Sequence, residues 1–271
     1  MVNDVWLLDI GNTKTKVVQL GLDNDAESVI VVTPSSDYDS PLDWLILHSD
    51  RVNNSQTRIF FASVHSDKED ALFTRKLIEH ACQYTQIHTE SCRFGLLNAY
   101  QQPSKMGVDR WLAMLGARLI TDNAFMVIDA GTAVTLDVVV EDAHIGGWIV
   151  PGLTLSKDAL TGATRRVCQA AMNTSALTFG TDTEDCVHFG GLAQLSGLLL
   201  SGIHVMQQHS QNYDVVITGG DSLAIQQCLE PLTISPRYTR VKNLVFIGML
   251  RYWFEAISVK NVQKLAQSLI I

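Results

Sequence analysis

Short apolar runs separated by polar turns occupy the first third of the chain. Residues 4–10, 14–20 and 28–33 are rich in β-branched and aromatic side chains, which predicts three strands in an antiparallel meander. A short helix over 40–49 follows, with Pro41 in its first turn, and then a strand over 57–63. Asp67 is predicted to cap a helix over 68–82. The predicted order is therefore β-β-β-α-β-α.

A second block of the chain repeats this alternation after an irregular stretch. Residues 92–106 show no periodicity, and Pro103 breaks any helix there, whereas Trp111, Leu112, Leu115 and Leu119 mark one face of a helix over 107–120. The remaining elements are predicted as strands over 125–129, 133–140, 144–150 and 214–218, and as helices over 153–171, 182–209, the residues after 221, and 243–257.

The first two strands enclose a turn that is suited to binding an anion. Gly11 and Asn12 tolerate the positive φ of a tight turn, and such a turn lets backbone N–H groups approach a phosphate. Asp9 before the turn is a possible metal ligand, and Thr13 offers a hydroxyl. Lys14 and Lys16 supply positive charge, although a hairpin without any ligand has the same local pattern.

The interpretation of this turn as an anion-binding site is supported by a second occurrence of the pattern. At an offset of 120 residues, Asp9 aligns with Asp129 and Gly11 with Gly131, and Thr15 and Val18 align with Thr135 and Val138. Two similar half-domains, each with an Asp-bearing hairpin, predict two turns that face each other across a cleft. Such a cleft suits a nucleoside triphosphate with a cation between the carboxylates.

These motifs resemble a known superfamily and, within it, one family. Paired Asp-Gly-Thr hairpins are the mark of actin-like ATPases. The four motifs at 9–16, 107–110, 129–133 and 146–152 together resemble the type III pantothenate kinases of bacteria. The resemblance implies an α/β actin-like ATPase fold with two ribonuclease H-like halves, residues 1–122 and 123–271, and a nucleotide cleft between them.

The resemblance also implies the reaction and its residues. ATP would phosphorylate the primary hydroxyl of pantothenate, the first step toward coenzyme A, with Asp109 orienting that hydroxyl and accepting its proton. The implied pantothenate-binding residues are Tyr100, Gly107, Val108, Asp109, Arg110 and Thr183. A homodimer is implied too, with Thr183 reaching across its interface. Asp109 and Arg110 fall in the first turn of a helix, where free N–H groups favour anions.

Nucleotide and cation roles follow from the same resemblance. The implied nucleotide-binding residues are Asp9, Ile10, Gly11, Asn12, Thr13, Lys14, Thr15, Lys16 and Thr132. Asp9 is the implied Mg²⁺-side carboxylate. Asp129 is the implied ligand of a monovalent cation, potassium or ammonium, although spacing alone does not distinguish potassium from magnesium there.

Composition narrows the classes of function that remain open. A formal net charge of −8 argues against binding to nucleic acid or to acidic membranes. Five cysteines without a CxxC pair are typical of a reducing compartment, and the sequence predicts a cytoplasmic chain without a signal peptide or membrane span. No histidine spacing fits a zinc site, and no Walker A motif occurs. The open alternatives are a kinase for another small hydroxy acid, a polyphosphate-type phosphatase, and a non-catalytic regulator of the same fold.

Overall fold

The computed structural model describes residues 5–22, 29–52, 57–163, 177–231 and 236–256. The chain divides into two compact units, the first made of residues 1–120 and 244–271 and the second of residues 121–243. Each unit is built on its own sheet, in which three strands form an antiparallel meander and further strands add in parallel.

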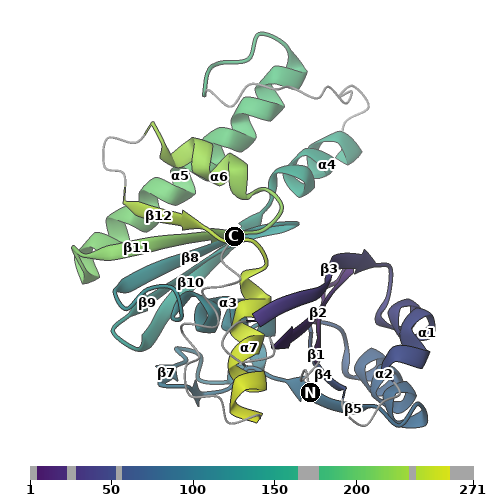
Figure 1. Ribbon diagram of the computed structural model, residues 1–271. Coiled ribbons are helices and arrows are strands. Elements are labelled where there is room, and N and C mark those ends of the chain that lie inside the picture. The colour runs from purple at the N-terminus through teal and green to yellow at the C-terminus, as the bar shows by residue number, and fades with distance from the viewer. Residues whose placement is uncertain (1–4, 23–28, 53–56, 164–176, 232–235, 257–271) are drawn as a thin grey trace. The chain divides into compact units, whose positions relative to one another are not determined.

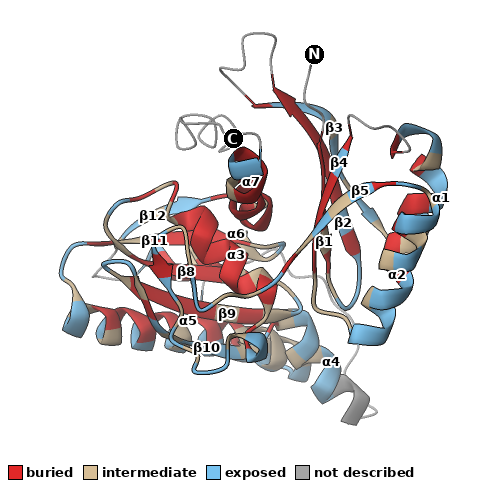
Figure 2. Cartoon of the chain, turned by 90° about the horizontal axis from the view of Figure 1, so that it is seen from below, coloured by how far each residue is buried: buried red, intermediate tan, exposed pale blue. Residues whose placement is uncertain are grey.

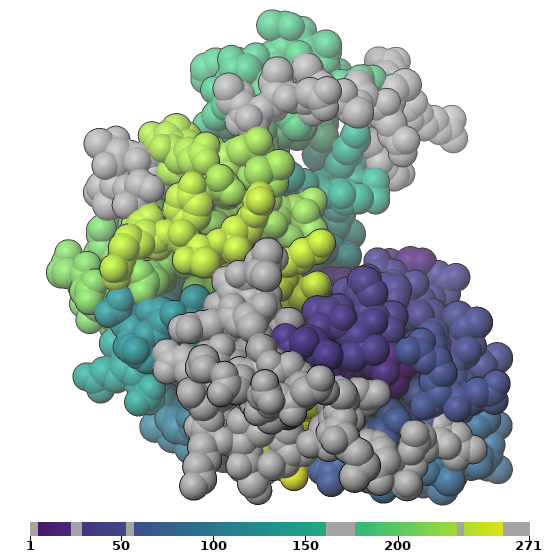
Figure 3. Space-filling model, viewed as in Figure 1, coloured from purple at the N-terminus to yellow at the C-terminus, as the bar shows by residue number. Residues whose placement is uncertain are grey.

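The first unit contains seven strands, four α-helices and one 3₁₀ turn among its described residues. They are β1 (Val5–Ile10), β2 (Thr15–Leu22), β3 (Val29–Tyr38), α1 (Pro41–Val52), β4 (Arg58–Ser63), α2 (Asp67–Glu79), β5 (Gln83–Ile87), β6 (Cys92–Arg93), β7 (Leu96–Leu97), η1 (Pro103–Lys105), α3 (Val108–Ala117) and α7 (Leu244–Ala256). The described residues of this unit up to Glu79, coloured purple to blue, lie next to one another on the visible face (Figure 3).

Helices cover both faces of the first sheet, whose strand order is β3-β2-β1-β4-β5 (Figures 1 and 2). Trp6, Leu8 and Ile10 pack in one cluster with buried residues of α1 and α2. Side chains alternate along a strand, so Asp9 lies on the other face, where α3 and α7 contact β4 and β1. The apolar run of β1 is therefore explained by burial on two sides, and Asp9 interrupts it on the α3 side.

The second unit consists of β8 (Ala124–Ala130), β9 (Ala133–Val140), β10 (Ala143–Pro151), α4 (Leu153–Ala163), α5 (Thr183–His209), β11 (Tyr213–Thr218), α6 (Ser222–Leu229) and β12 (Arg237–Arg240). Its own strands follow the order β10-β9-β8-β11-β12 within a seven-stranded sheet. When the strands are numbered within each unit, the first sheet and these five strands share the order 3-2-1-4-5, which supports the predicted internal duplication.

Helix α5 is the core helix of the second unit. Phe189, Leu195 and Leu199 on α5 are buried in the same cluster as Met126 and Ile217 of the sheet. Within the described residues, α5 is also the one helix long and apolar enough to cross a membrane by length and composition. That is weak evidence for a span, because a core helix passes the same test.

Most predicted elements are present, although several differ in their bounds and some were not predicted. Ser66 rather than Asp67 precedes α2 as its N-cap, in a capping box with Glu69. Strands β5, β6, β7 and β12 and the 3₁₀ turn η1 were not predicted. Helix α4 is described only to Ala163, so the rest of the predicted 153–171 helix lies outside the described residues.

The C-terminal helix groups with the first unit, whereas the sequence prediction assigned residues 123–271 to the second half. Helices α3 and α7 approach closely at two glycines. A Cβ on Gly248 would lie 2.1 Å from the Leu112 carbonyl oxygen, and one on Gly116 would lie 2.6 Å from that of Leu244. Most residues of α7 are buried, so its apolar sequence indicates a core helix. The same sequence does not indicate whether the helix packs in the first or the second unit.

Candidate active site

The first hairpin exposes most of the residues predicted to bind phosphate. The Gly11 N–H donates to the Lys14 carbonyl oxygen over 3.0 Å, which closes the turn. Asn12, Thr13 and Lys16 are exposed, whereas Thr15 is only 1% exposed and its hydroxyl has no hydrogen-bond partner among the described residues. The exposed face of the turn therefore consists of backbone, short polar side chains and lysine.

The two lysines of this hairpin have different surroundings. Lys14 forms an exposed ion pair with Asp39, which raises the pKa of Lys14 above its ordinary value and lowers that of Asp39. Lys16 lies directly opposite Asp9 in the β1–β2 register. Of the two, Lys16 is thus the lysine placed beside the predicted metal-side carboxylate.

The second hairpin resembles the first but has a shorter turn. The Gly131 N–H donates to the Ala133 carbonyl oxygen over 3.0 Å, and Asp129 lies opposite Thr135. In the first hairpin the residue opposite the aspartate is Lys16. The predicted alignment at a constant offset of 120 is therefore wrong beyond the glycine, since Thr135 corresponds to Lys16 and not to Thr15. The second turn contains one residue fewer.

Two glycines let neighbouring segments pack against the second turn. A Cβ on Gly152 would lie 2.2 Å from the Gly131 carbonyl oxygen, and the Gly152 N–H donates to the Thr132 carbonyl oxygen over 2.9 Å. A Cβ on Gly219 would lie 2.5 Å from Oδ1 of Asp129. These contacts explain the glycines at positions 152 and 219, whereas a Cβ on Gly220 would meet nothing within 4 Å. They also fix Asp129 between the turn and the start of α6.

The start of α3 brings together five of the six residues predicted to bind substrate, including Val108, the first residue of the helix. Gly107 is the N-cap, and a Cβ there would lie 2.4 Å from Oδ1 of Asp109. That same oxygen accepts a 2.8 Å hydrogen bond from the Arg110 N–H. Arg110 is buried, and its Nη1 donates to the Tyr100 hydroxyl over 3.1 Å. The Asp109 carboxylate therefore has a defined position, and only glycine at position 107 leaves room for it.

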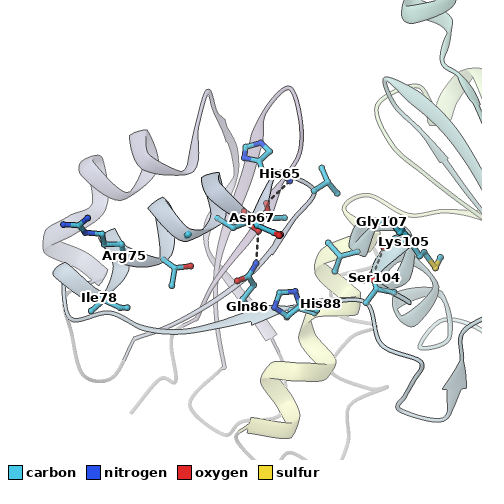
Figure 4. Close-up of a pocket in the computed structure, with 18 of the residues that line it drawn as sticks. His65, Asp67, Arg75, Ile78, Gln86, His88, Ser104, Lys105 and Gly107 are labelled. Carbon is cyan, nitrogen blue, oxygen red and sulfur yellow. Dashed lines mark hydrogen bonds between the residues drawn. The ribbon is translucent and has the colours of Figure 1, made fainter. Parts of the chain in front are cut away.

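A cavity of about 1150 Å³ opens beside this helix start, within the first unit (Figure 4). Gly107 and Val108 line one side of it, and the first residues of α2 line the other. His65 and His88 also line the wall. The cavity is large enough for a small organic substrate.

Thr183, the remaining residue predicted to bind substrate, belongs to the second unit. It is the first residue of α5, after the N-cap Asp182, whose side chain accepts from the Asp185 N–H. Thr183 lines a second cavity of about 480 Å³ together with Lys157 and His188.

His65 is a residue at the site that the sequence analysis missed. Its Nε2 lies 2.9 Å from the Gly11 carbonyl oxygen, although the two residues are 54 positions apart. A signal was available, because His65 follows the strand predicted over 57–63, and the carboxyl ends of neighbouring parallel strands meet at one edge of a sheet.

Two solved structures share this fold. A putative 2-dehydro-3-deoxygalactonokinase from Sinorhizobium meliloti matches at a TM-score of 0.63 and 14% identity, and a putative Baf family transcriptional activator from Campylobacter jejuni matches at a TM-score of 0.55 and 20% identity. Each match covers 94% of this chain and 100% of the other chain. The chain thus has the fold of the actin-like ATPases, with one Asp-Gly hairpin in each unit. The profile of the type III pantothenate kinase family matches residues 5–204. A type III pantothenate kinase of Pseudoalteromonas atlantica is 33% identical over 92% of this chain and 96% of its own length, and one of Colwellia psychrerythraea is 28% identical over 92% and 99%. The chain belongs to the type III pantothenate kinase family.

Proposed function

We propose that this chain transfers the terminal phosphoryl group of ATP to the primary hydroxyl of pantothenate, in the cytoplasm. Membership of the family supports the reaction. The observation that carries the proposal is the start of α3, where the Asp109 carboxylate packs on Gly107 beside the Arg110–Tyr100 pair. These residues match the family's substrate motif, and Gly107 lines a cavity of suitable size.

In the proposed mechanism, Asp109 orients the hydroxyl and accepts its proton as the phosphoryl group transfers. A carboxylate suffices because the loose transition state requires proton acceptance only late. Arg110 has a fixed position, since it is buried and hydrogen-bonded to Tyr100, so its charge is available without further ordering. We assign Tyr100, Val108 and, from the second unit, Thr183 to pantothenate binding.

ATP binding is assigned to the first hairpin and to Thr132. The described residues contain no cluster of three or more His, Cys, Asp or Glu side chains that could hold a metal ion. Mg²⁺ needs only one or two carboxylates when phosphates and water complete its shell, and Asp9 is the carboxylate proposed to hold it. The ion would neutralise phosphate charge when bound.

A monovalent cation, potassium or ammonium, is assigned to Asp129. The support is the donor set, because Oδ1 of Asp129 and the Ala130 carbonyl oxygen both lie beside Gly219. Hard cations prefer such carboxylate and carbonyl oxygens.

A homodimer is also proposed. Large apolar side chains are exposed in the second unit: Ile149 is 60% exposed and Phe179 96%, and Trp148, Leu155 and Leu160 are exposed as well. A second copy of the chain that covered these side chains would remove their apolar surface from water. Light scattering should give twice the chain mass, and a monomer mass at assay concentration would contradict the proposal.

The test of the function is ATP-dependent phosphorylation of pantothenate, measured with potassium, ammonium and sodium salts. We expect turnover that potassium or ammonium stimulates relative to sodium. Absence of turnover on pantothenate with all three ions would favour a kinase for another hydroxy acid or a non-catalytic regulator.

The two hairpin lysines give a matched pair of variants. Lys16→Ala should raise the KM for ATP about tenfold, because it removes a positive charge beside the proposed phosphate site. Lys14→Ala should have a smaller effect, since Lys14 is already paired with Asp39. Steady-state kinetics with ATP varied will compare them. Equal effects of the two substitutions would contradict the assignment of Lys16.

A further inference from the structure

We propose that His65 is a positioning residue that fixes the peptide between Gly11 and Asn12 for binding a nucleoside triphosphate. The inference rests on the proposed role of the first hairpin in ATP binding. The His65 Nε2 lies 2.9 Å from the Gly11 carbonyl oxygen. Since a carbonyl oxygen only accepts hydrogen bonds, Nε2 carries the proton and donates it.

The backbone holds His65 firmly in this position. Strand β4 runs parallel to β1 with Ser63 beside Ile10, and the Val64 N–H donates to the Ile10 carbonyl oxygen over 3.0 Å. The His65 N–H donates to Oγ of Ser63 over 3.1 Å. The next residue, Ser66, is the N-cap of α2. His65 is thus fixed between the end of a strand and the start of a helix.

Two successive peptide groups of the turn are therefore held in place. The Ile10–Gly11 peptide is held by Val64 on one side and by the Lys14 carbonyl oxygen on the other. The Gly11–Asn12 peptide is held by His65. In a trans peptide the N–H points opposite to the C=O, so the Asn12 N–H is directed away from His65.

This contact matters because glycine leaves the peptide free to rotate. Gly11 is suited to a tight turn, yet the same freedom allows the following peptide to change direction in the absence of ligand. The hydrogen bond from His65 limits that rotation and pre-organises the Asn12 N–H for a phosphate oxygen. Pre-organisation lowers the entropic cost of binding, so its loss appears mainly in nucleotide affinity.

His65 also lines the first cavity together with Gly107, as Figure 4 shows, so direct contact with pantothenate is the competing explanation. Nucleotide affinity without pantothenate separates the two roles. The measurement is the dissociation constant for a non-hydrolysable ATP analogue with Mg²⁺, by calorimetry, on the full chain.

We expect His65→Leu to weaken nucleotide binding about five- to tenfold, the effect of losing one hydrogen bond. His65→Gln should stay within about twofold of the wild type, because the glutamine amide places an N–H donor near the position of Nε2. His65→Asn should behave like His65→Leu, since its donor is too short to reach Gly11. His80→Ala, on the half-buried residue after α2, is the control and should not change affinity.

Three results would overturn the role of His65: an unchanged dissociation constant in His65→Leu, a glutamine variant as weak as the leucine variant, or a defect confined to the KM for pantothenate. If the substitutions impaired folding instead, the active fraction would fall in all three variants. His65→Gln would then not differ from the other two in affinity. If the wild type bound nucleotide but did not phosphorylate pantothenate, the proposed reaction would fail. The affinities would still decide the role of His65.

Discussion

Asp109→Asn should lower kcat for pantothenate phosphorylation by about 10²- to 10⁴-fold, the usual contribution of a positioned general base. The amide keeps the shape of the side chain and loses its capacity to accept a proton. Nucleotide affinity should stay unchanged, because Asp109 is proposed to act on the hydroxyl and not on ATP. Steady-state kinetics and calorimetry will separate the two effects.

Gly107→Ala tests the same carboxylate without removing it. The added methyl group would lie 2.4 Å from Oδ1 of Asp109, so the carboxylate must move. We expect a loss in kcat/KM for pantothenate of at least tenfold, because misplacement of a catalytic group by about 1 Å is costly. Asp50→Asn, on an exposed residue of α1, is the matched control. If both Asp109→Asn and Gly107→Ala kept the turnover of the wild type, Asp109 would have no role in the mechanism.

Gly248→Ala should destabilise the first unit by about 1–3 kcal/mol, the typical cost of overpacking a core. Its Cβ would lie 2.1 Å from the Leu112 carbonyl oxygen, a backbone atom that moves only with α3. Each kcal/mol should lower the Tm by roughly 2–4 °C for a chain of this size. Chemical denaturation and calorimetry provide the measurement.

Gly197→Ala is the matched control for the helix-packing prediction. It is also a helical glycine, yet a Cβ there meets nothing within 4 Å. Alanine should therefore stabilise α5 by about 0.5–1 kcal/mol. The two substitutions should change stability in opposite directions, and a Gly248→Ala variant as stable as the wild type would show that α3 and α7 pack less closely than described.

The sequence predicted the parts of the fold that depend on local patterns. The β1–β2 hairpin and its counterpart followed from apolar runs around Gly11 and Gly131, and helix α3 followed from its apolar face. The fold class and the family are confirmed by the comparisons. The individual roles of the site residues stay predictions.

What the sequence did not predict depends on pairing between distant segments. Strand β5 consists mostly of polar residues without strict alternation, and it forms by parallel pairing with β4, which no local pattern marks. The contact between His65 and Gly11 arises from the parallel register of β1 and β4. The one-residue difference between the two turns became visible only in the cross-strand register.

The grouping of α7 with the first unit has a consequence for synthesis of the chain. On the ribosome, residues 1–120 emerge first, but the helix that packs against α3 emerges only after the whole second unit. Until then the face of α3 that α7 covers stays exposed, including Leu112 at the closest approach. Since domains generally fold as units during synthesis, the second unit is free to fold before α7 completes the first. The half that is made first is thus completed last.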